Sequence, residues 1–148
     1  MKSSTTVVLL ICFAISMNSC SQDYRKLSES EVDSKKARIA NDFATNFLKK
    51  LNSGAHYEFT DEATETFKQK FDQQSQTAVS QQLNNNFGEY KSLEYSETWI
   101  KISNPEMNIF RFKGDFAKGN RKLEIRVVLN KDDKISGFWI KPWSDIFK

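Results

Sequence analysis

The sequence predicts an α+β fold in which three N-terminal helices pack on a curved, four-stranded antiparallel sheet. Apolar residues recur with a period of about 3.6 before Gly88 and with a period of 2 after it. All helical segments precede all strand segments, and turn residues separate the strands. This order favours helices layered on one face of a sheet over alternating βαβ units.

The first expected helix covers residues 32–51 and ends at Asn52-Ser53-Gly54, where Asn and Gly tolerate the left-handed conformation that closes helices. Its apolar stripe consists of Val32, Ile39, Ala40, Phe43, Phe47, Leu48 and Leu51. We expect a second helix over residues 61–73 and a third over 77–86.

The four expected strands cover residues 89–102, 107–116, 123–129 and 135–141. In the second and third, apolar side chains such as Phe112 and Ile125 alternate with charged ones such as Arg111, Glu124 and Arg126. One face of the sheet is therefore expected to form the core.

The N-terminus predicts a signal peptide over residues 1–19. Lys2 precedes an apolar run over residues 7–15, which is about half the roughly 20 residues that a membrane-spanning helix needs. Ser19 stands directly before Cys20 and Met17 lies three positions before it, which resembles the lipobox of bacterial lipoproteins, although Asn18 is unusual there. The alternative is an incidental cysteine after a conventional signal.

The resemblance implies cleavage before Cys20, diacylglycerol on its thiol and an acyl chain on its amine, which together give stable anchoring. We therefore expect a lipidated N-terminus and flexible tether over residues 20–34 and a single domain over 35–148. The implied location is the cell envelope. Ser21 implies the outer membrane rather than the inner one if the envelope is Gram-negative.

Charge and cysteine content restrict the chemistry. The formal net charge is +3 without a basic stripe, which argues against nucleic acid as a partner. Cys12 and Cys20 are the only two cysteines, and both are used by the signal and the anchor. We expect no disulfide, no metal and no cofactor, and no nucleotide or nucleophile motif is present.

The residues also resemble the nuclear transport factor 2-like, cystatin-like α+β cone, and within it a secreted bacterial subgroup without assigned function. The resemblance rests on Phe47-Leu48 through Gly54, Phe67, Phe71, Leu83, Phe87-Gly88, residues 127–130 and residues 134–142. It implies a cavity between the helices and the concave face of the sheet. It implies no reaction, because the superfamily contains isomerases, dehydratases, adaptors and binding modules.

The candidate pocket residues are Tyr95, Trp99, Arg111, Glu124, Arg126 and Trp139. If the polar sheet face lines the cavity, the two arginines and the glutamate suit an anionic or amide-bearing ligand. If that face points outward, they form a solvated cross-strand charge network, which is the interpretation we favour. Trp139 is expected in the core, and Trp143 is expected to cover a pocket mouth or a partner surface.

Other chemical candidates have simpler explanations, so no catalytic residue is assigned. His56 is the only histidine and lies in a polar turn. Asp61, Glu62 and Glu65 suit the first turns of a helix. Asp132-Asp133 suits a hairpin turn better than a calcium loop.

The leading functional hypothesis is a lipid-anchored envelope domain that binds a small molecule or a protein partner without catalysis; a homodimer is one form of such binding. One alternative is a cone-fold enzyme of isomerase or hydrolase-accessory type that uses pocket acids and aromatic residues. Another is a structural or assembly lipoprotein that acts through its sheet face.

Overall fold

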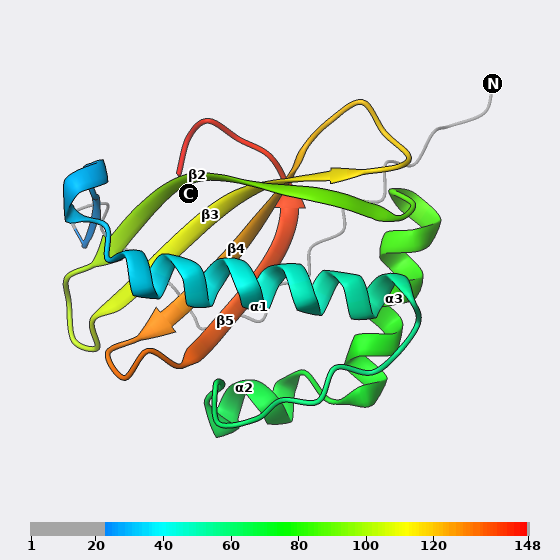
Figure 1. The fold of residues 1–148 in the computed structure, drawn as a ribbon, viewed down its shortest axis with the longest axis horizontal. Coiled ribbons are helices and arrows are strands. Elements are labelled where there is room, and N and C mark those ends of the chain that lie inside the picture. Colours follow the sequence, from blue (N-terminus) through cyan, green and yellow to red (C-terminus); the bar gives the residue numbers. More distant parts are fainter. Residues whose placement is uncertain (1–22, 148) are drawn as a thin grey trace.

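The computed structural model describes residues 23–147, which form a mixed α+β fold with an open, five-stranded antiparallel sheet in the order β1-β2-β3-β4-β5 (Figure 1). The helices are α1 (Ser34–Asn52), α2 (Glu65–Lys70) and α3 (Gln73–Asn86), and a 3-10 turn covers Glu29–Glu31. The strands are β1 (Tyr24–Lys26), β2 (Tyr90–Lys101), β3 (Met107–Phe116), β4 (Leu123–Asn130) and β5 (Ile135–Pro142). The α+β class and the order of helices before the four long strands are confirmed.

The sheet has one strand more than expected. Strand β1 lies in the segment interpreted as a flexible tether and pairs with β2, Tyr24 opposite Lys101 and Lys26 opposite Trp99. The backbone N–H of Ile102 donates to the carbonyl of Asp23 at 2.9 Å, which extends this pairing by one residue. Three polar residues are too few to show a period of 2, so the sequence pattern did not reveal the strand.

The ends of the helices follow their capping side chains. Asp33 accepts from the backbone N–H groups of Lys35 and Lys36 and starts α1. The second helix starts at Glu65 instead of Asp61, because Thr64 is its cap and Ala63 forms a bridge with Ile135. The third starts four residues earlier than expected, because Asp72 caps it by accepting from the N–H of Ser75.

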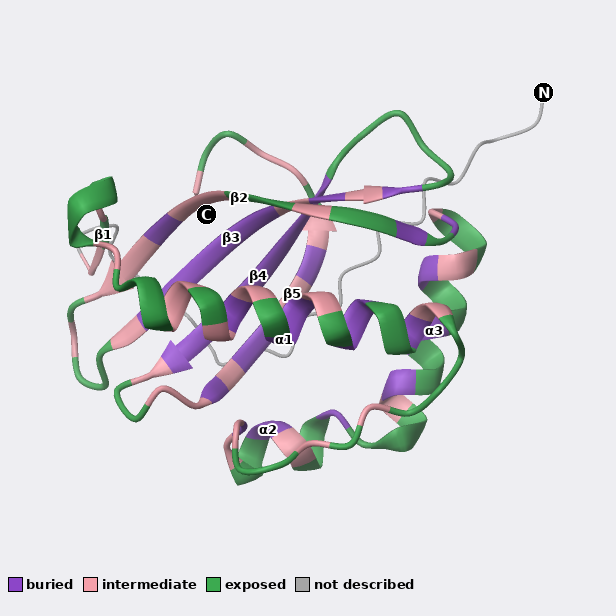
Figure 2. Cartoon of the chain, in the orientation of Figure 1, coloured by how far each residue is buried: buried purple, intermediate pink, exposed green. Residues whose placement is uncertain are grey.

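Helix α1 crosses one face of the sheet (Figure 1). We call this the inner face, and it carries apolar side chains of the central strands. The core cluster joins α1 to Phe110, Phe112, Ile125 and Val127 of β3 and β4. Buried residues accordingly concentrate along the central strands (Figure 2). The alternate residues of those strands point to the opposite side, which we call the outer face.

Aromatic rings fill the space between α1, α2 and the sheet. The Phe47 ring centroid lies 5.1 Å from that of Phe138 on β5 and 5.5 Å from that of Phe71. Phe43 lies 5.8 Å from Phe138 and 6.2 Å from Phe67 on α2. These edge-on contacts fill the space in which the cone resemblance implied a cavity.

Candidate functional site

The outer face carries a buried group of charged side chains. Arg111 on β3 lies opposite Arg126 on β4, and Glu124 lies two residues before Arg126. Arg111 and Glu124 are 0% exposed and Arg126 is 8% exposed. The favoured interpretation of a solvated charge network is therefore wrong about solvation, although the three residues do face away from the helices.

Glu124 is the centre of this group because both arginines bind its carboxylate. Arg111 donates from Nε to Oε1 at 3.0 Å and from Nη2 to Oε2 at 2.9 Å. Arg126 donates from Nε to Oε1 at 2.8 Å, and its Nη2 lies 2.6 Å from the same oxygen. Lys141 Nζ lies 3.7 Å from Oε2. Such paired, charge-assisted bonds satisfy a carboxylate that burial would otherwise destabilise.

Glu97 on β2 is a second acceptor at the edge of the group. Its Oε1 accepts from Arg111 Nη1 and from Trp99 Nε1, the latter at 2.9 Å. Its Oε2 lies 2.6 Å from Lys26 Nζ on β1. The charged group thus extends across the sheet from β1 to β5.

The electrostatics keep both carboxylates ionised. Burial alone raises the pKa of Glu124, but the hydrogen bonds of Arg111 and the charges of Arg126 and Lys141 outweigh it, so the pKa is lowered. The pKa of Glu97 is lowered in the same way, against its burial, by Lys26, Trp99 and Arg111. A carboxylate held in this state is a poor general acid near neutral pH.

The C-terminal residues 143–147 fold back over the charged group, and we call them the C-terminal cover. The Trp143 ring lies 4.6 Å from Arg111 Cζ, and the Phe147 ring lies 4.5 Å from Arg126 Cζ. Arg111 Nη2 also donates to the carbonyl of Ser144 at 2.7 Å. Both arginines therefore lie between a carboxylate and an aromatic ring, an arrangement that cation–π attraction stabilises.

The cover is fixed at both ends by backbone and ring contacts. The backbone N–H of Trp143 donates to the backbone carbonyl of Lys122 at 3.1 Å. Phe147 stacks on Trp99 with ring centroids 4.4 Å apart and 10° between the planes. Phe147 also lies 5.5 Å from Tyr24 of β1. The cover thus joins the C-terminal end of the described chain to its first strand.

Five of the six candidate pocket residues share the outer face, and Tyr95 does not. Tyr95 pairs with Phe112 and its ring lies 6.0 Å from that of Phe112 on the inner side. A bulge between Tyr95 and Glu97 inserts Ser96 and reverses the alternation. Tyr95 and Trp99 were grouped as aromatic residues of one expected strand, and the bulge places them on opposite faces of the sheet.

Trp139 also differs from its expected role, because it is half-buried on the outer face rather than in the core. Its ring lies over Gly137, where an added Cβ would meet ring carbons at 2.4 Å. Gly137 therefore makes room for this indole. Trp143, expected to cover a pocket mouth or a partner surface, covers the buried charges instead.

Sequence reasoning missed Glu97, Lys141 and Phe147. Glu97 stands two residues before Trp99 and therefore shares its face, which is a weak signal for its role. Lys141 stands two residues after Trp139 in β5 and opposite Glu124, so alternation offers the same weak signal for it. Phe147 lies beyond β5, and no local pattern identifies it.

The remaining titratable candidates are surface or turn residues. His56 is exposed. Glu62 accepts from the Tyr57 hydroxyl at 2.9 Å, and burial together with this bond raises the pKa of Tyr57. Asp133 lies in the hairpin turn with φ of 60° and pairs with Lys35 at 2.9 Å. Among residues 23–147, no three acidic or histidine side chains are grouped as metal ligands.

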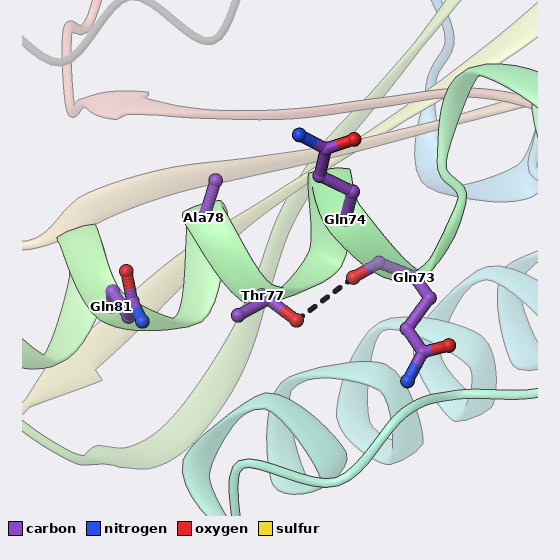
Figure 3. A pocket seen from close by; sticks show the side chains of 5 residues that line it. All are labelled: Gln73, Gln74, Thr77, Ala78 and Gln81. Carbon is purple, nitrogen blue, oxygen red and sulfur yellow. Dashed lines mark hydrogen bonds between the residues drawn. The ribbon is translucent and has the colours of Figure 1, made fainter.

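Two surface depressions lie outside the charged group. One of about 590 Å³ is lined by Gln73, Gln74, Thr77, Ala78 and Gln81, all from one side of α3, so it is an open surface (Figure 3). The other, of about 40 Å³, lies where α2 meets β5 beside Phe67 and Trp139. Neither has the size and enclosure of an ordinary small-molecule pocket.

Cys20 and the signal segment lie outside the described residues. Within residues 23–147, no helix has the length and apolar character needed to cross a bilayer.

Comparison with curated proteins and comparison with solved structures each give no match. A family model described as "Protein of unknown function (DUF3887)" matches residues 44–138, which is more than half of the chain and extends from α1 into β5. The chain therefore belongs to the DUF3887 family of proteins of unknown function.

Proposed function

We propose that this chain is the precursor of a lipid-anchored cell-envelope protein whose domain binds a protein partner through its surface and performs no chemistry. The observation that carries the binding mode is the aromatic filling between α1, α2 and the sheet. Phe47 and Phe71 are 0% and 1% exposed there, and Phe138 is 2% exposed. A ligand site of several hundred Å³ would require these rings to leave the core.

The charged group supports binding over catalysis. A catalytic acid or base needs a proton-exchanging atom within reach of a substrate. Glu124 is fully buried, and arginines occupy both of its oxygens beneath Trp143. The enzyme alternative would require the C-terminal cover to open and one arginine to release its carboxylate.

The anchor rests on the signal sequence. Lys2, the apolar run over residues 7–15 and Ser19-Cys20 have the order of a lipoprotein signal, and Ser21 accords with the outer membrane of a Gram-negative envelope. We also infer that the fold is a filled variant of the nuclear transport factor 2-like cone, because α1 crosses one face of a twisted antiparallel sheet.

The anchor is tested by Cys20→Ser in the full chain, with Cys12→Ser as the matched control because Cys12 lies inside the expected signal. We expect Cys20→Ser to lose the acyl mass and to leave the membrane fraction, while Cys12→Ser keeps both. If Cys20→Ser still sediments with membranes and keeps the acyl mass of the unsubstituted protein, Cys20 is not the anchor.

The binding mode is tested by native mass spectrometry of the acylated chain extracted from its host in mild detergent. We expect a bound protein, either foreign or a second copy, in fixed stoichiometry. A non-covalent small molecule that is retained in the gas phase and released on unfolding would contradict the proposal. Phe138→Ala shows where such a small molecule is held. Because Phe138 lies in the core, its truncation changes the retained amount of a molecule bound inside the cone and does not change that of a molecule bound at the surface.

A further inference from the structure

The first strand lies very close to the proposed anchor. The carbonyl of Asp23 accepts from the N–H of Ile102 at 2.9 Å, and Tyr24 pairs with Lys101. Only Ser21 and Gln22 separate Asp23 from Cys20. Covalent geometry limits the span from Cys20 to Asp23 to about 11 Å. A lipid on Cys20 therefore holds β1 beside the bilayer and prevents the domain from standing away from it.

Of the three large apolar side chains that are exposed among residues 23–147, the two most exposed belong to this end of the domain. Ile102 is 60% exposed and directly follows the β2 residue that pairs with Tyr24. Ile146 is 63% exposed and precedes Phe147, whose ring lies 5.5 Å from that of Tyr24. Exposed isoleucines are costly in water but favourable at the boundary of lipid headgroups and acyl chains.

Three aromatic side chains belong to the same end of the domain and contact one another. Tyr24 and Phe147 are half-buried, and Trp99 stacks on Phe147. Tyrosine and tryptophan, whose rings carry a polar group, are enriched at membrane interfaces. Figure 1 places β1 and the C-terminal end at one end of the sheet and α3 at the other.

We propose that the end of the domain that carries Tyr24, Ile102 and Ile146 rests on the lipid surface, with both isoleucines at the headgroup boundary and α3 directed away from it. This inference rests on the proposed anchor at Cys20. The short link raises the effective concentration of the bilayer at these side chains, so that weak apolar contacts suffice to fix the orientation.

The orientation is tested by cysteine labelling of the full chain, since residues 23–147 contain no cysteine. Ile102→Cys and Ile146→Cys are the test variants, and Gln81→Cys on α3 is the matched control because Gln81 is also exposed. Each acylated variant carries an environment-sensitive fluorophore. It is reconstituted into vesicles of phosphatidylethanolamine and phosphatidylglycerol that contain a spin-labelled lipid quencher.

We expect at least about twofold stronger quenching at positions 102 and 146 than at 81, because interfacial side chains lie within about 5–10 Å of the acyl boundary. Adding Ile102→Asp should reduce quenching at 146, and adding Gln81→Asp should leave it unchanged. Equal quenching at all three positions, or stronger quenching at 81, overturns the orientation.

The same samples separate the two proposals by intact mass. An acylated chain with no preferential quenching contradicts the orientation alone. A chain without acyl mass contradicts the anchor, and the orientation fails with it.

Discussion

In β3 and β4, the central parts of the two sheet faces are buried to a similar extent by different means. On the inner face, Phe112 and Ile125 pack against the helices. On the outer face, Arg111 and Glu124 lie one residue away from them in the same strands and are 0% exposed beneath the C-terminal cover. Burial therefore does not require apolar residues, provided that every charge is matched.

The difference lies in what each face contributes to stability. Burying apolar rings removes hydrocarbon from water and stabilises the fold directly. Burying ions costs desolvation that their pairing only offsets, so the outer face contributes geometric specificity more than net free energy. Substitutions on the two faces should consequently differ in their dependence on pH.

Phe47→Ala tests the inner face and should have the largest effect. Phe47 touches Phe43, Phe71 and Phe138, so truncation leaves a cavity in the centre of the core. We expect a loss of about 3–5 kcal/mol in the free energy of unfolding by urea titration, with little dependence on pH. A loss below about 1 kcal/mol would mean that the core accommodates a void and is not tightly filled.

Glu124→Gln tests the outer face, because it leaves Arg111 and Arg126 buried without their shared counter-charge. We expect a loss of about 3–5 kcal/mol near neutral pH. Asp115→Asn is the control, since Asp115 and Lys122 form an ion pair with both side chains about half exposed. That variant should lose less than about 1 kcal/mol.

The pH dependence of Glu124→Gln distinguishes it from a packing defect. The folded pKa of Glu124 lies below its ordinary value of 4.5, so its stabilisation is complete above that pH and is lost as the pH falls through the folded pKa. The unfolding free energies of the parent and Glu124→Gln should therefore converge below about pH 4.5. A difference that stays constant on acidification would assign the effect to shape alone.

Trp143→Ala tests whether the C-terminal cover seals the charges. The variant loses ring contacts with Arg111 at 4.6 Å and with Lys113 Nζ at 4.8 Å. We expect a loss of about 1–2 kcal/mol in thermal unfolding that becomes smaller at high salt, and Trp143→Phe should retain most of the stability. No change in either variant would show that the sheet alone protects the charges.

Lys26→Ala should have the smallest effect. Lys26 Nζ pairs with Glu97 at the edge of the sheet, but its side chain is 56% exposed. We expect the free energy of unfolding, measured by urea titration, to fall by less than about 1 kcal/mol. Lys131→Ala is the control, because Lys131 and Asp132 form an ion pair that is also solvent-exposed. A larger loss than this would show that β1 depends on the charged group for its pairing.

Much of the fold was predictable because its signals are local. The stripe of Phe43, Phe47 and Leu51 predicted α1, and the alternation in residues 107–116 predicted β3 with the observed bounds. Several neighbouring polar residues can each cap a helix, and the sequence does not show which one does. The starts of α2 and α3 were therefore misplaced by four residues each. The three-residue strand β1 carried no periodic signal at all.

The sequence predicted most residues of the candidate site but not how deeply they are buried. Arg111, Glu124 and Arg126 were identified together because period 2 places them on one face. Their burial depends on Trp143 and Phe147 folding back across the sheet, and Tyr95 was misplaced because the bulge at Ser96 has no distinctive sequence signal.

The sequence by itself determined the α+β class, the order of the elements and the apolar inner face, since each follows from periodicity over a few neighbouring residues. Only the tertiary structure decided that the space between the helices and the sheet is filled, that β1 joins the sheet and that the outer charges are sealed. The physical reason is that occupancy and solvation of a face depend on side chains brought from distant parts of the chain.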